Sequence, residues 1–140
     1  MYRYWIDGGL MPASTISGDV RGAIKTALAS VAANVYDVVP EAPAVPFAAI
    51  VPDSPYMELE TIGRSPTRVN LNYVISVGVA YMSNPASLDN LEKLVISILG
   101  ALSASKYELS TVERPSVTQI GVQNVLVSDI RLSVRYEQTS

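Results

Sequence analysis

The chain has 140 residues, a length that suits one domain of ordinary size. Its formal net charge is −3, so the chain as a whole repels a phosphate backbone, which argues against a protein that grips nucleic acid. Histidine and cysteine are both absent, which removes the commonest general base, the commonest metal ligand and most nucleophilic catalytic arrangements. We therefore expect no enzyme activity and no catalytic, cofactor-binding or metal-binding residues.

Charged residues are scarce, at 16% of the chain against a usual value of about 25%. A free monomer normally covers itself with charged side chains, so this scarcity indicates a surface hidden against partners. Tyrosine is abundant by contrast, with eight Tyr against one Phe, and rings with a polar tip suit protein interfaces. The composition thus predicts assembly with copies of the chain and with other proteins.

Residues 1–16 are predicted to form an extended N-terminal arm, because Pro12 and the glycine pair before it exclude a continuous helix. The arm either packs on its own domain or docks on a neighbouring subunit. Residues 17–140 are predicted to form a single α+β domain. Three aromatic residues of the arm are candidates for contact with a partner: Tyr2, Tyr4 and Trp5.

A first helix is predicted from Ser17 or Asp19, as the capping residue, to about Tyr36. Its apolar residues keep helical spacing on one face: Val20, Ile24, Ala27, Leu28, Val31 and Val35. The opposite face carries no charge from residue 26 onward. Its small residues Ala29 and Ala33 would let another surface approach closely, so both are candidates for a subunit interface.

The prolines between residues 40 and 46 predict an extended connector. A short buried strand is then expected at Phe47–Val51, a turn at Asp53–Pro55 and a second strand at Tyr56–Ile62.

The clearest pattern in the chain is a long strand, whose apolar residues fall at every second position: Val69, Leu71, Tyr73, Ile75, Val77, Val79 and Tyr81. This alternation is typical of a strand and not of a membrane-spanning helix, so we expect no membrane partner. The other face of the strand is neither charged nor strongly apolar. Such a face is expected where helices cover one side of a sheet and a neighbour or a lumen meets the other.

A second helix is predicted to begin at Asn84 and Pro85, with an apolar stripe from Leu88 to Leu102. A connecting strand follows at 107–112, and residues 121–124 suit a hairpin turn. The last strand should face inward with Leu126, Ile130, Leu132, Val134 and Tyr136. The predicted fold is therefore α+β, a mainly antiparallel sheet with two helices packed on one face.

Two carboxylates, Glu58 and Glu60, lie two residues apart on a predicted strand and so share a face. Catalytic carboxylate pairs normally face each other across a cleft from different segments, so an acidic surface or interface is the favoured interpretation. Tyr56, beside them, is a candidate for contact with a partner.

Four arginines form a possible patch. Arg64 and Arg68 flank Pro66 before the long strand, and Arg131 and Arg135 share the outer face of the last strand. The patch could touch phosphate, but the acidic residues near it in the sequence favour ion pairs between subunits.

Four phrases of the sequence, together with the order of elements, carry a resemblance to a known family: Pro52–Tyr56, Arg68–Leu71, Leu88–Glu92 and Arg114–Ser116. From about Val20 to Tyr136 the chain resembles the tail terminator proteins of long-tailed bacteriophages with non-contractile tails.

The resemblance implies a subunit of a ring, with six copies expected, that sits on the tail tube, ends its polymerisation and joins it to the head-side connector. DNA would pass through the lumen without specific binding. The protein would belong to the tail or neck of the virion, after assembly in the host cytoplasm, with no cofactor.

Two alternatives remain open at this point. The first is a head-closure or connector subunit of the neck, which is also small and ring-forming. The second is a small-molecule-binding α+β domain or enzyme, with Glu58, Glu60, Arg64 and Arg68 around a pocket.

Overall fold

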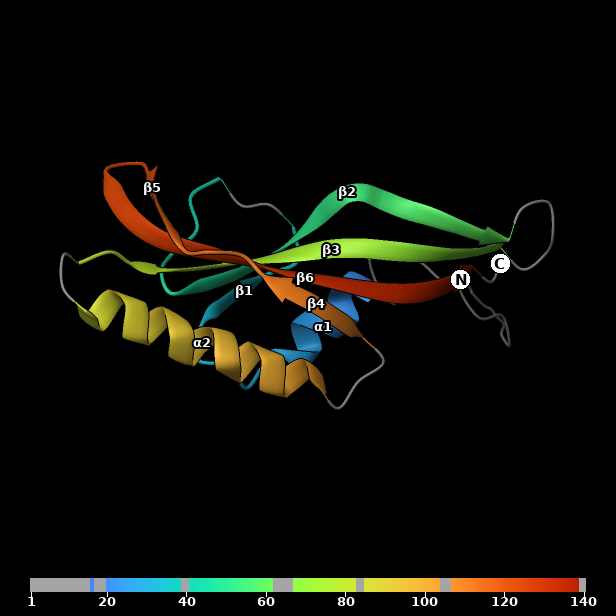
Figure 1. Ribbon diagram of the computed structural model, residues 1–140, viewed down its shortest axis with the longest axis horizontal. Helices are drawn as coiled ribbons and strands as arrows, with labels where there is room; N and C mark the ends of the chain where they lie inside the picture. Colours follow the sequence, from blue (N-terminus) through green and yellow to red (C-terminus); the bar gives the residue numbers. More distant parts are fainter. Residues whose placement is uncertain are drawn as a thin grey trace, which may run out of the picture.

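In the computed structural model, six strands form one mixed sheet and two helices pack on one of its faces (Figure 1). The structure describes residue 16 and residues 20–38, 41–61, 67–82, 85–103 and 107–138. The predicted fold class is confirmed. In chain order the elements are α1 (Gly22–Ala27), β1 (Asn34–Tyr36), β2 (Phe47–Thr61), β3 (Thr67–Ala80), α2 (Pro85–Ser103), β4 (Glu108–Val112), β5 (Ser116–Ile120) and β6 (Gln123–Gln138).

β3 and β6 form the centre of the sheet and pair antiparallel without interruption, from Thr67 opposite Gln138 to Ala80 opposite Val125. β2 pairs antiparallel with the other side of β3, and the short β1 pairs parallel with the start of β2. β4 and β5 pair with successive stretches of the outer side of β6. The order across the sheet is therefore β1, β2, β3, β6, and then β4 and β5 on the same edge.

The main core lies between the sheet and the two helices. Alternate residues of β3 and β6 face it, as the sequence pattern predicts. Burying one such large apolar side chain contributes about 1.5–3 kcal/mol, so this cluster accounts for most of the stability of the fold. Its fully buried members include Ile24 and Leu28 from the α1 region, Leu91, Ile98 and Leu102 from α2, and Leu71, Tyr73, Ile75 and Ile130 from the sheet.

The first helix is much shorter than predicted, since α1 ends at Ala27 and not near Tyr36. The expected inward positions are correct, because Ile24, Leu28 and Val31 are all buried. After Leu28, however, the chain turns more tightly than an α-helix, with the amide of Val31 donating to the carbonyl of Leu28 at 3.0 Å. Helical spacing identified the buried residues but not the end of the helix.

Asn34 gives the physical reason for this difference. Its backbone amide donates to the carbonyl of Pro46 at 2.9 Å, and its side-chain amide donates to the carbonyl of Ala44 at 2.9 Å. The amide of Ala44 in turn donates to the hydroxyl of Tyr36 at 3.1 Å. These bonds hold residues 34–36 against the connector as strand β1, so tertiary pairing overrides the helical pattern.

β2 is one strand where two strands and a turn were predicted. The register against β3 shifts between Pro52 and Met57, so the predicted turn residues Asp53–Pro55 form an irregularity within the strand. On β3, Asn72 donates its side-chain amide to the carbonyl of Pro55 at 2.9 Å and bridges the irregularity. Because this half of β2 lies at an edge of the described sheet, its prolines are tolerated and the chain bulges without reversing.

The second helix begins at Pro85, as predicted. The buried hydroxyl of Ser87 accepts from the amide of Met82 at 2.6 Å and donates to its carbonyl at 2.7 Å, which ties the start of α2 to the end of β3. Two residues predicted to face inward are exposed. Tyr81 follows the last residue of β3 and leaves its alternation, and Leu88 is displaced because the buried stripe of α2 passes through Ser87.

The hairpin predicted at residues 121–124 is confirmed. Ile120 pairs with Gln123, and the two residues between them form the turn that joins β5 to β6 (Figure 1). Gly121 has φ of 63°, a conformation that favours glycine and suits a short hairpin connection.

A smaller apolar cluster lies on the other face of the sheet, around the buried residues Phe47, Ala49 and Val125. Gly78 is directly opposite Phe47 in the register. The Phe47 ring lies so close over Gly78 that a Cβ atom at this position would overlap the ring carbons. The ring therefore occupies the space that a side chain at position 78 would need.

Gly78→Ala is expected to lower the free energy of unfolding by about 1–3 kcal/mol, because the added methyl group must displace a packed ring. The matched control is Gly100→Ala in α2, where no described atom outside the neighbouring helix backbone lies within 4 Å of the new Cβ. The control should be neutral or stabilising by up to about 1 kcal/mol, since alanine favours the helix. Urea unfolding of both variants measures the difference, and equal midpoints would contradict the close contact.

Candidate interaction surface on the sheet

The face of the sheet away from α1 and α2, which we call the open face, changes character along its length. Near β1 it is apolar, with the cluster around Phe47. In the middle it carries polar side chains, and at the far end it carries charged ones. None of the described helices lies on this face (Figure 1).

Four of the predicted interface residues lie on the open face, all of them exposed: Glu58, Arg68, Arg131 and Arg135. Asn70 of β3 is opposite Glu58 on one side and opposite Arg135 on the other. An acid, an amide and a base thus follow one another across β2, β3 and β6. The sheet brings together residues that are far apart in the sequence.

Hydrogen bonds between side chains join the three strands across the middle of this face. Asn72 donates to Oε1 of Glu58 at 2.8 Å and accepts from the hydroxyl of Ser133 at 2.7 Å. Ser76 donates to Oδ1 of Asp129 at 2.6 Å. The neutral face predicted for β3 is therefore a hydrogen-bonded polar layer, with its groups held in fixed orientations.

Arg131 clamps this layer from β6. Its Nη1 donates to both carboxylate oxygens of Asp53, at 2.9 Å and 3.2 Å, and its Nε lies 3.5 Å from Oε2 of Glu113. Asp53 belongs to the irregularity of β2, and Glu113 lies between β4 and β5. Ion pairs were expected between copies of the chain, but those of Arg131 are formed within one chain. The pair with Asp53 spans β3, and the pair with Glu113 reaches the segment between β4 and β5.

Tyr56, predicted to face a partner, is partly buried against the main core. Its ring meets Tyr73 edge on, with centroids 5.5 Å apart and 77° between the ring planes, and the two hydroxyls are 2.9 Å apart. Burial, together with this hydrogen bond, raises the pKa of the Tyr73 phenol well above its ordinary value, and the nearby Arg21 opposes the effect. The contact is therefore formed within one chain, against the main core.

Ala29 and Ala33 do not lie on one helical face, because both follow the end of α1. Ala29 is exposed in the turn after the helix, and Ala33 is partly buried against the core. Both border a shallow hollow, together with Lys25 and Val35. The predicted back of a long helix is therefore wrong as a description of this surface.

Five further candidates lie wholly or partly outside the described residues. These are Tyr2, Tyr4, Trp5 and Arg64, and also Glu60, whose backbone belongs to β2 but whose side chain is not described.

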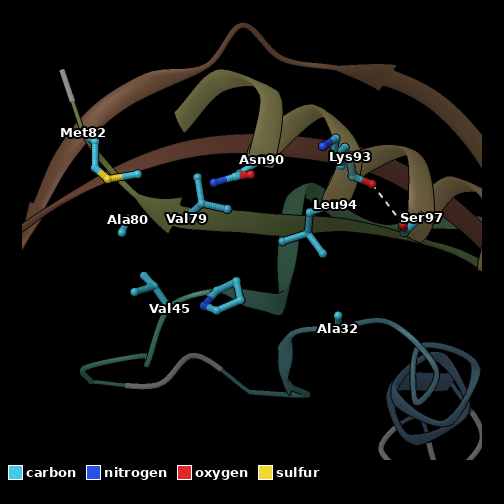
Figure 2. A pocket seen from close by; sticks show the side chains of 10 residues that line it. Ala32, Val45, Val79, Ala80, Met82, Asn90, Lys93, Leu94 and Ser97 are labelled. Atoms are coloured by element: carbon cyan, nitrogen blue, oxygen red, sulfur yellow. Dashed lines mark hydrogen bonds between the residues drawn. The ribbon is translucent and has the colours of Figure 1, made fainter. Parts of the chain in front are cut away.

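A second hollow, of about 410 Å³, lies between α2, the end of β3 and the residues just before β1 and β2 (Figure 2). In Figure 2, Leu94 points from the helix toward Ala32, and Val45 lies on the side opposite α2. Its walls are mostly apolar, and among the described residues that line it only Lys93 is charged. The lining residues are Ala32, Val45, Pro46, Val79, Ala80, Met82, Asn90, Lys93, Leu94 and Ser97.

Of the residues that a small-molecule site was expected to use, those whose side chains are described line neither hollow. Glu58 and Arg68 lie on the open face, and neither lines the hollows described above. The hollow beside α2, mostly apolar with one lysine, could bind a ligand through close packing and apolar contact. Its described residues do not place an acid and a base together for catalysis.

Exposed apolar side chains are spread over several elements of the described chain. The most exposed are Val122 at the hairpin tip, Ile96 on α2 and Leu59 on β2. Met57 and Leu59 are opposite Leu71 and Val69, so they lie on the helix side of the sheet, at its β2 edge. These residues add apolar surface to a chain with few charges.

Among the described residues, no three acidic side chains gather where they could hold a metal ion. No described helix is both long enough and apolar enough to cross a membrane. Comparison of the sequence with protein-family models and with curated proteins gives no match.

Sequence reasoning missed two features of this surface. It placed Asp53 in a turn and gave Glu113 no role, although both pair with Arg131. The sequence does indicate that Arg131 faces outward from a strand and needs an acidic partner. It does not indicate that this partner is Asp53, because Asp53 lies 78 residues away, in the irregularity of β2. The hollow of about 410 Å³ could not be predicted from the sequence, because its walls come from separate segments of the chain.

Asp53→Asn is expected to lower the free energy of unfolding by about 0.5–1 kcal/mol at low salt, because the Arg131 side chain is 44% exposed and its ion pairs are screened. Concentrated NaCl should shrink the difference. Glu113→Gln, whose carboxylate is more exposed and further from the guanidinium, is the matched control and should cost less. An unchanged urea midpoint for Asp53→Asn at low salt would show that the clamp adds no stability.

The pH dependence of stability follows from Tyr73. Its phenol keeps its proton in the folded state to a higher pH than in the unfolded state, where it titrates near about 10. Stability is therefore fully present below that pH and decreases as the pH rises above it. Tyr73→Phe should weaken this decrease, whereas Tyr81→Phe, at an exposed position, should keep the wild-type slope. Urea unfolding between pH 8 and about 11 measures how the free energy of unfolding changes with pH. The same change for wild type and Tyr73→Phe would contradict the assignment of this pH dependence to Tyr73.

Proposed function

We propose that this protein is a structural subunit of a bacteriophage tail, which forms a closed ring on the end of the tail tube, stops its polymerisation and joins it to the head-side connector. The proposal combines the resemblance of residues 20–136 to tail terminator proteins with the surface of the subunit. The observation that carries it is the open face, a polar layer without a covering helix among the described residues.

The open face suits contact with other protein molecules or with a lumen. Its central groups, Asn72, Ser76 and Ser133, already have partners on neighbouring strands, so a second surface can meet them without leaving them unsatisfied. Polar groups fixed in this way lose little further entropy on contact. The open face can therefore bind a neighbouring protein surface at a low cost in side-chain entropy.

The scarcity of charge supports the same function. A closed ring uses head-to-tail contacts, which require two different adhesive surfaces on each subunit. The exposed apolar residues Leu59 and Ile96 lie on different elements, at the β2 edge and on α2. The net charge of −3 also suits a channel through which DNA slides without adhering.

The proposal is tested by the purified protein, alone and with tail tubes. We expect one closed oligomer in sedimentation, rings with a central hole in electron micrographs, and capped tubes that no longer grow. Binding to DNA-filled heads in the absence of tails, without capping of tubes, would favour a head-closure subunit instead. A monomer at high concentration that ignores tubes and heads would contradict both functions.

A further inference from the structure

The hollow beside α2 has the size of a small-molecule site. Its volume of about 410 Å³ lies within the range of such sites, about 300–1,000 Å³. The described residues that line it include none of α1, which ends at Ala27. Ala32, in the segment that leads to β1, faces α2 instead (Figure 2). The fold therefore leaves room for a ligand between α2 and the segments that precede β1 and β2.

The hollow has an apolar floor. Val79 of β3 and Leu94 of α2 both line it and are each 7% exposed. Met82, just after β3, is 45% exposed and adds apolar surface that water reaches. An apolar ligand that removes this surface from water is bound favourably. The floor is thus suited to the apolar part of a ligand.

Polar side chains lie along one flank of α2 at the edge of the hollow. Asn90, Lys93 and Ser97 share this flank because they are three and four residues apart. The hydroxyl of Ser97 donates to the carbonyl of Lys93 at 2.9 Å, as the dashed line in Figure 2 shows. The side chains of Asn90 and Lys93 form no hydrogen bond or ion pair with the described residues. An amide and an ammonium group therefore remain available as donors.

The charge of the hollow selects the polar end of the ligand. Lys93 is the only charged residue among those described that line it. An ammonium and an amide both donate hydrogen bonds, and a carboxylate accepts from both. Asp89 and Glu92 are exposed on α2 close to Lys93 in the sequence, and their charges disfavour a ligand with two negative charges. A single negative charge matches one lysine best.

We propose that this hollow binds an amphipathic monocarboxylate, with its aliphatic chain against Val79 and Leu94 and its carboxylate at Lys93 and Asn90. The apolar stem of Lys93 packs along such a chain while its ammonium group stays in water. The carboxylate keeps its contact with water at the edge, so it is not desolvated in the apolar floor. This inference goes beyond the proposed function and does not depend on the ring.

Decanoate is the first probe, titrated into the full-length protein by calorimetry below its micelle-forming concentration. We expect one decanoate per chain. Octanoate should bind about tenfold more weakly, because it lacks two methylene groups that the floor would cover. Decylammonium, with the same chain and the opposite charge, should also bind at least about tenfold more weakly. Equal affinities for decanoate and decylammonium would overturn the proposal.

Lys93→Gln tests the polar end of the site. Decanoate should bind this variant about tenfold more weakly, since a charge-assisted contact is lost. Lys25→Gln is the matched control, because Lys25 is exposed on α1, outside this hollow, and the variant has the same net charge. The control should bind like the wild type. An equal loss in both variants would show an effect of net charge alone and would contradict the site.

Ala32→Phe tests the apolar part, because a ring at this exposed position fills the hollow from the side opposite Leu94 (Figure 2). Decanoate binding should fall below detection. Ala29→Phe, also exposed but outside this hollow, is the control and should retain the wild-type affinity. Circular dichroism of each variant establishes that it is folded. Wild-type affinity in folded Ala32→Phe would show that decanoate binds elsewhere.

The outcomes separate this inference from the proposed function. Rings that cap tubes but bind no decanoate at millimolar concentration would overturn the site and leave the function standing. A monomer that ignores tubes but binds decanoate through Lys93 would support the site, while the function fails. If Ala32→Phe prevents ring formation and the wild-type ring binds no decanoate, the hollow holds a neighbouring copy, and the proposal is wrong.

Discussion

The uninterrupted pairing of β3 with β6 is the constraint on which the rest of the structure depends. Because side chains alternate between the two faces of a strand, one register fixes which residues of both strands enter the core. Tyr73 and Leu132 face the helices together, and Val74 and Arg131 face away together. A slip of one residue would place arginine and aspartate under α2, so burial alone enforces this register. The two helices then cover the only face that is apolar along its whole length.

The open face follows from that choice. Once the apolar positions point to the helices, the polar positions of the same strands lie together, and hydrogen bonds centred on Asn72 and the ion pairs of Arg131 order them. These contacts reach the irregularity of β2 and the break between β4 and β5, so a feature that looks like a turn in the sequence becomes part of a fixed surface. The acids of this surface are held in place, Glu58 by the side-chain amide of Asn72 and Asp53 by Arg131.

Few charged residues and exposed apolar side chains occur together in this chain. Charged residues make up 16% of the sequence, and Met57 and Leu59 of β2 are exposed on the helix side of the sheet. On the open face, the sheet places Glu58 and Arg135 at the level of one asparagine, Asn70.

The sequence by itself determined the class of fold, the inward residues of β3 and β6, those of α2 apart from Leu88, and the hairpin at Gly121, because these depend on local periodicity and turn chemistry. It did not determine where α1 ends or that β2 is continuous. Asn34 leaves the helical pattern to bond with Ala44 and Pro46, and Asn72 bridges Asp53–Pro55 from a neighbouring strand. Of the candidate interface, the sequence supplied Glu58 and a patch of arginines, but not the strand register that sets them opposite one another. Only the tertiary structure decided that Glu58 and Arg135 share one level of the sheet and that Arg131 pairs with Asp53, because these contacts join residues that no local pattern connects.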